Sequence, residues 1–306
     1  MRKIAAVSVV LSAVAAVAIV AAGGAADSVT RPKVLGIAYV KFKVTNLEKA
    51  KAFYGGELGL ASGGAISDGK ATNTVFVVNP YQHVELENTA PSTGGSYLAE
   101  IGLATDDLAK MREYLTAKGV PADRIRTRPD GPDCFETADP EGNKIVFVEQ
   151  KRTGPETGAA GVIRHKLIHA GIIVKDAEAE NRFYGAELGF HVYWHGGMQP
   201  DVMNWLAMQV PDGTDWIEYM LHIPADADKR TRGVMYHISL GVPSVAAAAK
   251  ELEAKGYSGF EAPKIGKDGK WQLNLYDPDF TRVELMEFTP VEKPCCSEFT
   301  GKHPAP

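Results

Sequence analysis

The sequence predicts an α+β protein made of four βαβββ modules, which pair into two homologous domains behind an N-terminal export signal. Two observations predict the doubling. Residues 52–60 read AFYGGELGL and residues 182–190 read RFYGAELGF, while TADPEGNKIVFVE (137–149) aligns with LYDPDFTRVELME (275–287). The third observation is that a strand, helix and strand pattern restarts inside each copy, so that each domain is itself a pair of modules.

The elements are clearest in the second copy, where short apolar runs predict strands and a polar start followed by helical apolar spacing predicts helices. Gly189 marks the end of the first helix. The expected order is a strand at 169–174, a helix at 176–188, strands at 190–195, 203–210 and 216–223, a strand at 237–242, a helix at 244–256, and strands at 271–276 and 282–288. We interpret this order as βαβββ twice.

The N-terminus predicts a signal peptide over residues 1–26. Arg2 and Lys3 precede an uncharged, mostly aliphatic run over 4–22, and small residues follow as far as Ala26. This is the layout of a cleaved secretory signal. The alternative is an uncleaved membrane anchor, since the run is long enough to span a bilayer. The signal predicts a secreted or periplasmic protein with no membrane association after cleavage.

The repeat also sets the domain boundaries. The first domain is expected at 33–150 and the second at 165–290. The Gly- and Pro-bearing stretch 151–164 is expected to be a linker, and 291–306 a C-terminal tail.

Composition narrows the function classes. Of 306 residues, 33 are Lys or Arg and 38 are Asp or Glu, which gives a net charge of −5 and argues against nucleic-acid binding. Three cysteines are too few for a disulfide scaffold. Export would expose Cys134, Cys295 and Cys296 to an oxidising compartment, and the odd number leaves at least one of them unpaired or joined to another molecule. We predict no catalytic role for them.

The modules, the FYGxELG helix end and the DPxxxxxE strand entry together resemble the vicinal oxygen chelate superfamily over about residues 33–290. That group includes glyoxalase I, methylmalonyl-CoA epimerase, fosfomycin and bleomycin resistance proteins, and extradiol dioxygenases. The resemblance implies sheets curled into a cup that holds a divalent metal ion and a small substrate with vicinal oxygens. An oligomer is possible.

The resemblance places metal ligands on the first and last strands of each module, and the second copy has suitable residues there. His169 and His237 open the first strands, and Glu218 and Glu284 occupy matching positions in WIEYML and RVELME. Glutamate is rare in an apolar strand unless it is paired or bound to metal. We therefore predict one divalent ion, Zn, Ni, Co, Mn or Fe, on these four residues. His169, His237 and Glu284 are the firmer three.

The first copy lacks this set. Tyr39, Glu100 and Val146 stand in place of His169, His237 and Glu284, and only Glu85 keeps the position of Glu218. The first domain is therefore expected to hold no metal. Six of the eight histidines and all four tryptophans lie in the second copy, and the tryptophans form either core packing or an aromatic wall for a substrate.

The chemistry that the resemblance favours is that of a glyoxalase I-like lyase or isomerase. There the metal stabilises an enediolate, and Glu284 or Glu218 would move the proton. Against it, no basic cluster for glutathione carboxylates stands out in the sequence.

The alternative is an extradiol-type dioxygenase with non-haem Fe(II) or Mn(II). His169, His237 and Glu284 resemble its ligand set, and His222 stands where those enzymes have an acid–base histidine, or else is a surface residue. Two residues differ from the dioxygenase pattern. Asn274 lies near the position where those enzymes have a tyrosine, and Phe280 occupies a turn position where they usually have glycine. A third possibility is a non-catalytic protein that binds or sequesters a small molecule.

Overall fold

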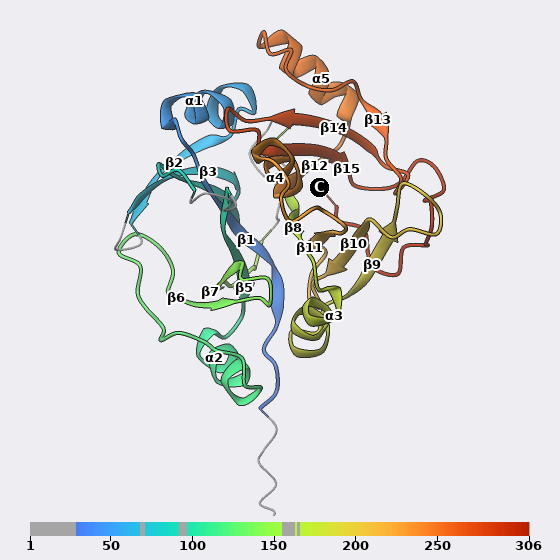
Figure 1. The fold of residues 1–306 in the computed structure, drawn as a ribbon. Coiled ribbons are helices and arrows are strands. Elements are labelled where there is room, and N and C mark those ends of the chain that lie inside the picture. The colour runs from blue at the N-terminus through green and yellow to red at the C-terminus, as the bar shows by residue number, and fades with distance from the viewer. Residues whose placement is uncertain (1–28, 68–70, 92–96, 155–162, 164–165, 306) are drawn as a thin grey trace, which may run out of the picture.

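The structure, a computed structural model, describes residues 29–67, 71–91, 97–154, 163 and 166–305. Two curled mixed sheets lie side by side, with helices on their outer surfaces (Figure 1). This confirms the predicted fold class. The predicted signal peptide lies outside the described residues, and none of the helices within them is long and apolar enough to cross a membrane.

The first copy forms a seven-stranded sheet in the order β2-β3-β4-β1-β5-β7-β6. Its elements are β1 (Val34–Lys43), α1 (Leu47–Lys51), η1 (Ala52–Glu57), β2 (Ala61–Ser67), β3 (Thr72–Asn79), β4 (Gln82–Glu87), β5 (Leu98–Thr105), α2 (Leu108–Ala117), β6 (Cys134–Ala138) and β7 (Lys144–Glu149).

The second copy forms an eight-stranded sheet in the order β13-β14-β15-β12-β8-β11-β10-β9. Its elements are β8 (Lys166–Ile173), α3 (Ala177–Glu180), η2 (Asn181–Glu187), β9 (His191–Gly196), β10 (Trp205–Gln209), β11 (Trp216–Met220), α4 (Lys229–Met235), β12 (His237–Val242), α5 (Val245–Ala254), β13 (Lys264–Ile265), β14 (Trp271–Tyr276) and β15 (Arg282–Glu287).

All four modules share one pairing scheme. The first strand of each module runs parallel to its last strand, as β8 does with β11 and β12 with β15. The two modules of a copy join through their first strands, which are antiparallel: β1 with β5, and β8 with β12. Two first strands therefore lie at the centre of each sheet, and alternate side chains of both strands point to the same face of it.

Each module helix begins at a capping side chain that accepts a hydrogen bond from a backbone N–H three residues on, as the polar starts in the sequence predict. These caps are Asn46, Asp107, Asp176 and Ser244. The predicted helix at 176–188 is only briefly α-helical. After Glu180 it widens to a π-helix, in which Leu188 N–H bonds to the carbonyl of Phe183, five residues back.

The second module of each copy is less complete than βαβββ. In the second copy the extra strand, β13, has two residues. In the first copy its place holds only an isolated bridge between Arg126 and Cys134. Pro121, Pro129 and Pro132 flank that bridge, and proline has no N–H for a sheet ladder.

The repeated motifs of one copy contact those of the other. The FYG tyrosine of the first copy, Tyr54, donates a hydrogen bond to Asp277 of the second copy at 3.3 Å. Tyr184 of the second copy donates to Asp139 of the first at 3.2 Å. Both aspartates belong to the repeated DP turns. All four residues are buried, so these turns help to join the two copies.

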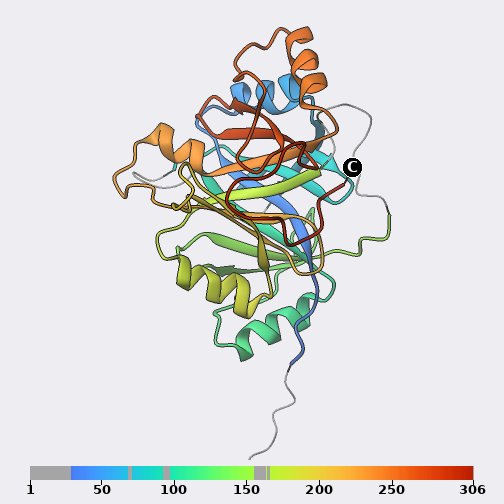
Figure 2. The ribbon, with the colours of Figure 1, turned by 90° about the vertical axis from the view of Figure 1, so that its right-hand side faces the viewer.

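The predicted C-terminal tail packs on the second copy and loops over its surface (Figure 2). The N–H of Thr300 bonds to the carbonyl of Tyr193 in β9, and the indole of Trp194 donates to the carbonyl of Cys295. Cys295 and Cys296 form a disulfide between neighbours, and Cys134 is a buried free thiol, as the odd number of cysteines requires.

Candidate metal centre

The four predicted ligands lie on the four central strands of the second sheet. His169 is in β8, Glu218 in β11, His237 at the start of β12 and Glu284 in β15. Because β11 pairs with β8 and β15 with β12, each module contributes one histidine and one glutamate from neighbouring parallel strands. All four residues, far apart in the chain, therefore come together.

Small residues opposite the histidines leave room for their rings. In the β8–β12 register His237 faces Gly171 and His169 faces Ser239. A Cβ added to Gly171 would lie 2.0 Å from Cε1 of His237, so the ring occupies the space that any larger side chain would need. Gly171 is thus required for the position of His237.

The distances between the donor atoms fit a shared ion. Nε2 of His169 lies 3.1 Å from Nε2 of His237 and 3.5 Å from Oε2 of Glu284. Oε2 of Glu218 lies 3.2 Å from Nε2 of His237 and 3.8 Å from Nε2 of His169. Ligands about 2.1 Å from one metal ion are separated by about 3.0 Å at right angles and about 3.4 Å in a tetrahedron.

The protonation of the histidines also suits metal binding. Burial lowers the pKa of both His169 and His237 well below the usual value, so both rings are neutral. Nδ1 of His237 donates to the carbonyl of Met235 at 2.9 Å, which leaves Nε2 with a lone pair directed at the site. His169 Nδ1 is buried and has no hydrogen-bond partner.

Glu218 is the carboxylate that contacts both histidines, whereas Glu284 contacts His169 and lies slightly nearer to it. His169, Glu218 and His237 each offer an atom within 4.8 Å of the others, and Glu284 lies outside this group of three. Glu284 is nonetheless in contact with His169, and burial raises its pKa to about 8. The sequence favoured Glu284 over Glu218, whereas the described geometry groups Glu218 with both histidines; which carboxylate binds the ion stays a prediction.

The side chain of Arg282 would compete with a metal ion for the lone pair on Nε2 of His237. The guanidinium of Arg282 donates to Nε2 of His237 at 2.7 Å. An ion bound at that nitrogen would require Arg282 to take another hydrogen-bond acceptor. Arg282 lies two residues before Glu284 on the same face of β15, which is why both side chains reach the site.

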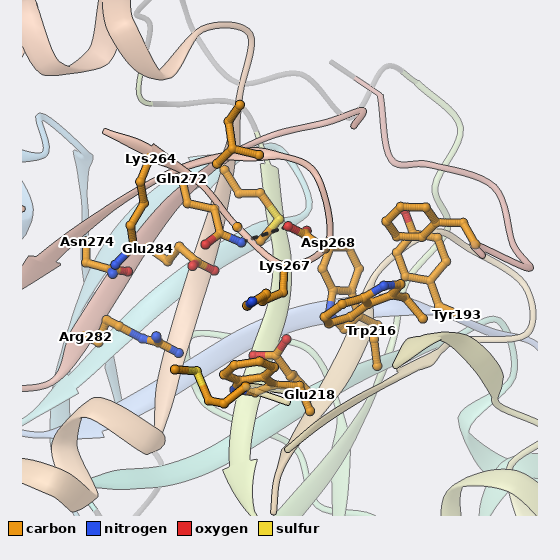
Figure 3. A pocket seen from close by; sticks show the side chains of 18 residues that line it. Tyr193, Trp216, Glu218, Lys264, Lys267, Asp268, Gln272, Asn274, Arg282 and Glu284 are labelled. Atoms are coloured by element: carbon orange, nitrogen blue, oxygen red, sulfur yellow. Dashed lines mark hydrogen bonds between the residues drawn. The ribbon is translucent and has the colours of Figure 1, made fainter. Parts of the chain in front are cut away.

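A cavity of about 380 Å³ opens beside the ligand set, and Glu218 and Glu284 form part of its lining (Figure 3). One side is an aromatic wall, which consists of Tyr193, Trp194, Trp205, Trp216 and Phe299. Three of the four tryptophans thus line the cavity, and Trp194 and Trp216 are also buried in a hydrophobic cluster, so both interpretations of them remain. Trp271 instead packs against the core.

Basic residues lie across from this wall, and sequence reasoning missed them. Lys264, Lys267 and Arg282 line the cavity, and Lys270 lies behind the aromatic wall. Three of them come from the segment KIGKDGK (264–270), in which lysine recurs every third residue. That spacing was the available signal. The spacing alone does not predict where the segment lies; the structure places it beside the cavity.

Lys270 is fully buried. Its ammonium lies 5.0–5.2 Å from the ring centres of Tyr193, Trp216 and Phe299 and donates to the Tyr193 hydroxyl at 3.2 Å. Burial lowers its pKa to about 8, against the opposing effect of Asp268. Rings around a desolvated cation stabilise its charge through their negative faces.

The tail contributes directly to the cavity. Phe299 packs on Tyr193 with ring centres 4.8 Å apart, and the N–H of Cys295 bonds to the carbonyl of Lys267 at 2.7 Å. The segment predicted as a tail thus holds both the wall and the basic side of the cavity in place.

His222, the other predicted catalytic residue, is exposed just beyond β11 in a left-handed backbone conformation with φ of 62°. It is not among the residues that line the cavity. Its proposed role stays a prediction.

In the first copy, the equivalent positions contain ion pairs. Tyr39 donates to Glu100 at 2.9 Å, and the ammonium of Lys41 lies 2.9 Å from Glu100 and 3.7 Å from Glu85. Burial would raise the pKa of Glu85, but the hydrogen bond from His83 and the charge of Arg128, 2.8 Å away, lower it to about 2. Side-chain cations thus neutralise these carboxylates, whereas we predict that a metal ion does so in the second copy.

Two family models match the chain, both described as "Glyoxalase/Bleomycin resistance protein/Dioxygenase superfamily". One matches residues 36–147 and the other residues 168–274, together more than two thirds of the chain. No curated protein sequence matches significantly.

Solved structures resemble most of the chain. The 2,3-dioxygenase LapB from Pseudomonas sp. KL28 is 16% identical with a TM-score of 0.65, over 90% of this chain and 96% of its own. Homoprotocatechuate 2,3-dioxygenase from Arthrobacter globiformis is 17% identical with a TM-score of 0.64, over 85% and 81%. The enzyme from Brevibacterium fuscum, in complex with 3,4-dihydroxyphenylacetate, is 18% identical with a TM-score of 0.62, over 84% and 81%. At this identity the likeness establishes the fold.

Proposed function

Because the chain belongs to the Glyoxalase/Bleomycin resistance protein/Dioxygenase superfamily, we propose that it is a metal-dependent enzyme that binds a small molecule through two adjacent oxygens and transfers a proton at the neighbouring carbon. The observation that carries this proposal is that His169, Glu218 and His237 come together with donor atoms 3.1–3.8 Å apart, while Glu284 lies 3.5 Å from His169. The cavity beside them has room for a small organic substrate.

His169, His237 and Glu218 would hold the ion, with Glu284 at its side. A bound divalent ion would supply Lewis acidity for negative charge on the substrate oxygens. Glu284 lies outside the group of three and lines the cavity, so in its ionised form it could accept the proton from the substrate carbon. Burial alone favours its protonated form, and the charge of a bound divalent ion would favour the ionised one. The aromatic wall would exclude water and fix the plane of the substrate.

A ring-cleaving dioxygenase is the second candidate. It is favoured by the dioxygenase structures that align over 84–90% of the chain and by the location, among the described residues, of the His and Glu set in the second copy. The departures at Asn274 and Phe280 weigh against it. Phe280 adopts φ of 66° in a turn where glycine is the usual residue.

Two assays on the same preparations distinguish these candidates. Protein loaded separately with zinc, nickel, cobalt, manganese or iron is given a methylglyoxal–thiol adduct in D₂O, and deuterium incorporation is followed by NMR. The same samples are given catechol in air, and oxygen uptake is recorded. Our proposal expects deuterium exchange or isomerisation without oxygen uptake.

The control variants are His237→Ala and His83→Ala. The first removes a ligand, and the second removes a half-buried histidine of the first copy. Catechol-dependent oxygen uptake that His237→Ala abolishes would favour the second candidate. Metal content and activity that are equal in both variants would overturn the metal site itself.

We also propose that the protein is exported, with residues 1–26 removed. The disulfide between Cys295 and Cys296 supports this, since disulfides persist mainly outside the cytoplasm. N-terminal sequencing of the protein recovered from cells tests it, and an intact Met1 in the mature protein would contradict it.

A further inference from the structure

The charges around the cavity are unevenly matched. Of the three acidic residues in its lining, Glu218 and Glu284 belong to the predicted ligand set, and the charge of Asp268 opposes that of the buried Lys270. The basic residues Lys264, Lys267 and Arg282 remain. With a divalent ion balancing the two glutamates, the cavity has an excess of positive charge.

Two of these basic groups have no carboxylate partner within the described part of the chain. Lys264 pairs with Glu261 at 3.0 Å. Lys267 makes no ion pair, and in Figure 3 its ammonium points into the cavity. Arg282 also makes no ion pair, and its buried Nε has no hydrogen-bond partner.

The single acceptor of Arg282 is the nitrogen that a metal ion would use. An ion on Nε2 of His237 would therefore leave the whole guanidinium without an acceptor among the described side chains. A desolvated guanidinium is costly unless hydrogen bonds satisfy it, and a carboxylate satisfies it in a bidentate way. The missing hydrogen-bond acceptor of Arg282 is then a group on the small molecule that binds in the cavity.

Lys270 adds positive charge near the cavity from behind the aromatic wall. Its ammonium is fully buried and has no carboxylate within ion-pair distance among the described residues. Three rings and one hydroxyl surround it, and Asp268 offsets part of its charge without forming an ion pair among the described residues.

We propose that the substrate carries an acid group, such as a carboxylate, which Arg282 and Lys267 bind while the aromatic wall packs on its apolar part. This inference rests on the proposed function, because it assumes that the vicinal oxygens of the same molecule face the ligand set. It adds a substrate class, namely small organic anions.

The test is a charge series of chelating probes that share one ring. The probes are 3,4-dihydroxyphenylacetate, 4-methylcatechol and 3,4-dihydroxybenzylamine, whose substituents are anionic, neutral and cationic. Binding to zinc-loaded protein is measured anaerobically by calorimetry. We expect the anion to bind about tenfold more tightly than the neutral probe, the scale of one charged hydrogen bond, and the cation to bind most weakly.

Two cavity variants test which side chains bind the acid group of the anionic probe. Lys267→Gln and Arg282→Gln are expected to bring the anion-to-neutral ratio close to one while 4-methylcatechol still binds. Lys293→Gln removes an exposed lysine that lies outside the cavity lining and should keep the wild-type ratio.

The outcomes separate the two proposals. Equal affinity for the three probes, or an unchanged ratio in both cavity variants, overturns the anionic substrate and leaves the metal site standing. If 4-methylcatechol binds equally well to His237→Ala, or if no probe binds to zinc-loaded protein, the proposed function fails and this inference fails with it.

Discussion

Arg282 donates a hydrogen bond to Nε2 of His237 over 2.7 Å, so a cationic side chain occupies the lone pair best placed to bind a metal ion. Two positive charges that compete for one nitrogen oppose each other at short range, where the protein screens them less than water does. The strength of metal binding should therefore depend on Arg282, which is not itself a ligand.

We predict that Arg282→Met tightens zinc binding about tenfold, because it removes a nearby positive charge while keeping most of the apolar stem. Competition with a chromogenic chelator at pH 7 measures the affinity. Arg230→Met is the matched control, since Arg230 is exposed and lies over the Phe280 ring. Equal or weaker zinc binding in Arg282→Met would show that the arginine does not oppose the ion.

The ligand set and its neighbours differ in how far the sequence could predict them. His169, Glu218, His237 and Glu284 could be predicted because strands place alternate residues on one face and because the module repeat supplies an internal template. Arg282 shares the face of Glu284 and could have been included on the same ground. Its contact with His237, however, depends on side-chain packing between strands.

The basic and aromatic sides of the cavity were harder to predict. Lys267 lies in the loop before β14, and Phe299 comes from the tail beyond the repeat, so neither has an equivalent in another module. Their place depends on tertiary contacts such as Cys295 N–H to Lys267 O. The π-helical end of the 176–188 segment was missed because apolar spacing over so short a stretch does not distinguish bonds to the fourth residue from bonds to the fifth.

The ion pairs of the first copy give a stability prediction. Lys41→Met leaves the buried Glu85 and Glu100 with fewer cations, because the ammonium of Lys41 lies close to both. Breaking a buried ion pair by removing one partner costs about 3 kcal/mol of unfolding free energy. Urea denaturation followed by circular dichroism measures this loss.

Lys110→Met is the matched control for that experiment, since Lys110 pairs with Asp107 on the exposed surface of α2. It should leave the unfolding midpoint nearly unchanged. A similar small effect of Lys41→Met would mean that Arg128 and Lys144 suffice to neutralise the two glutamates.

Glu180 gives a pH dependence at the junction between the copies. Burial, followed by the nearby charge of Asp139, raises the pKa of Glu180 to about 8 from 4.5. A carboxyl whose pKa is raised on folding stabilises the protein only while it is protonated. Between pH 4.5 and 8 we expect the free energy of unfolding to fall as pH rises, by at most about 1.4 kcal/mol per pH unit from this residue.

The Glu180→Gln variant should therefore be more stable than the wild type at pH 8 and similar to it near pH 4.5. Thermal unfolding at several pH values checks this. Glu178→Gln, an exposed change on the same helix, should leave the pH profile unaltered. A parallel profile for Glu180→Gln and wild type would mean that Glu180 titrates normally.

The role of the C-terminal segment can be tested at Phe299. Its ring contacts Tyr193 and the ammonium of Lys270, and it forms part of the cavity wall. We predict that Phe299→Ala lowers the unfolding free energy by about 1–2 kcal/mol and weakens binding of 4-methylcatechol to the zinc-loaded protein, because the wall loses a ring and Lys270 loses a cation–π partner. Val291→Ala, at an exposed position of the same segment, should change neither. Loss of stability without loss of probe binding would limit Phe299 to a structural role. If neither changed, the segment would not form a wall of the cavity in solution.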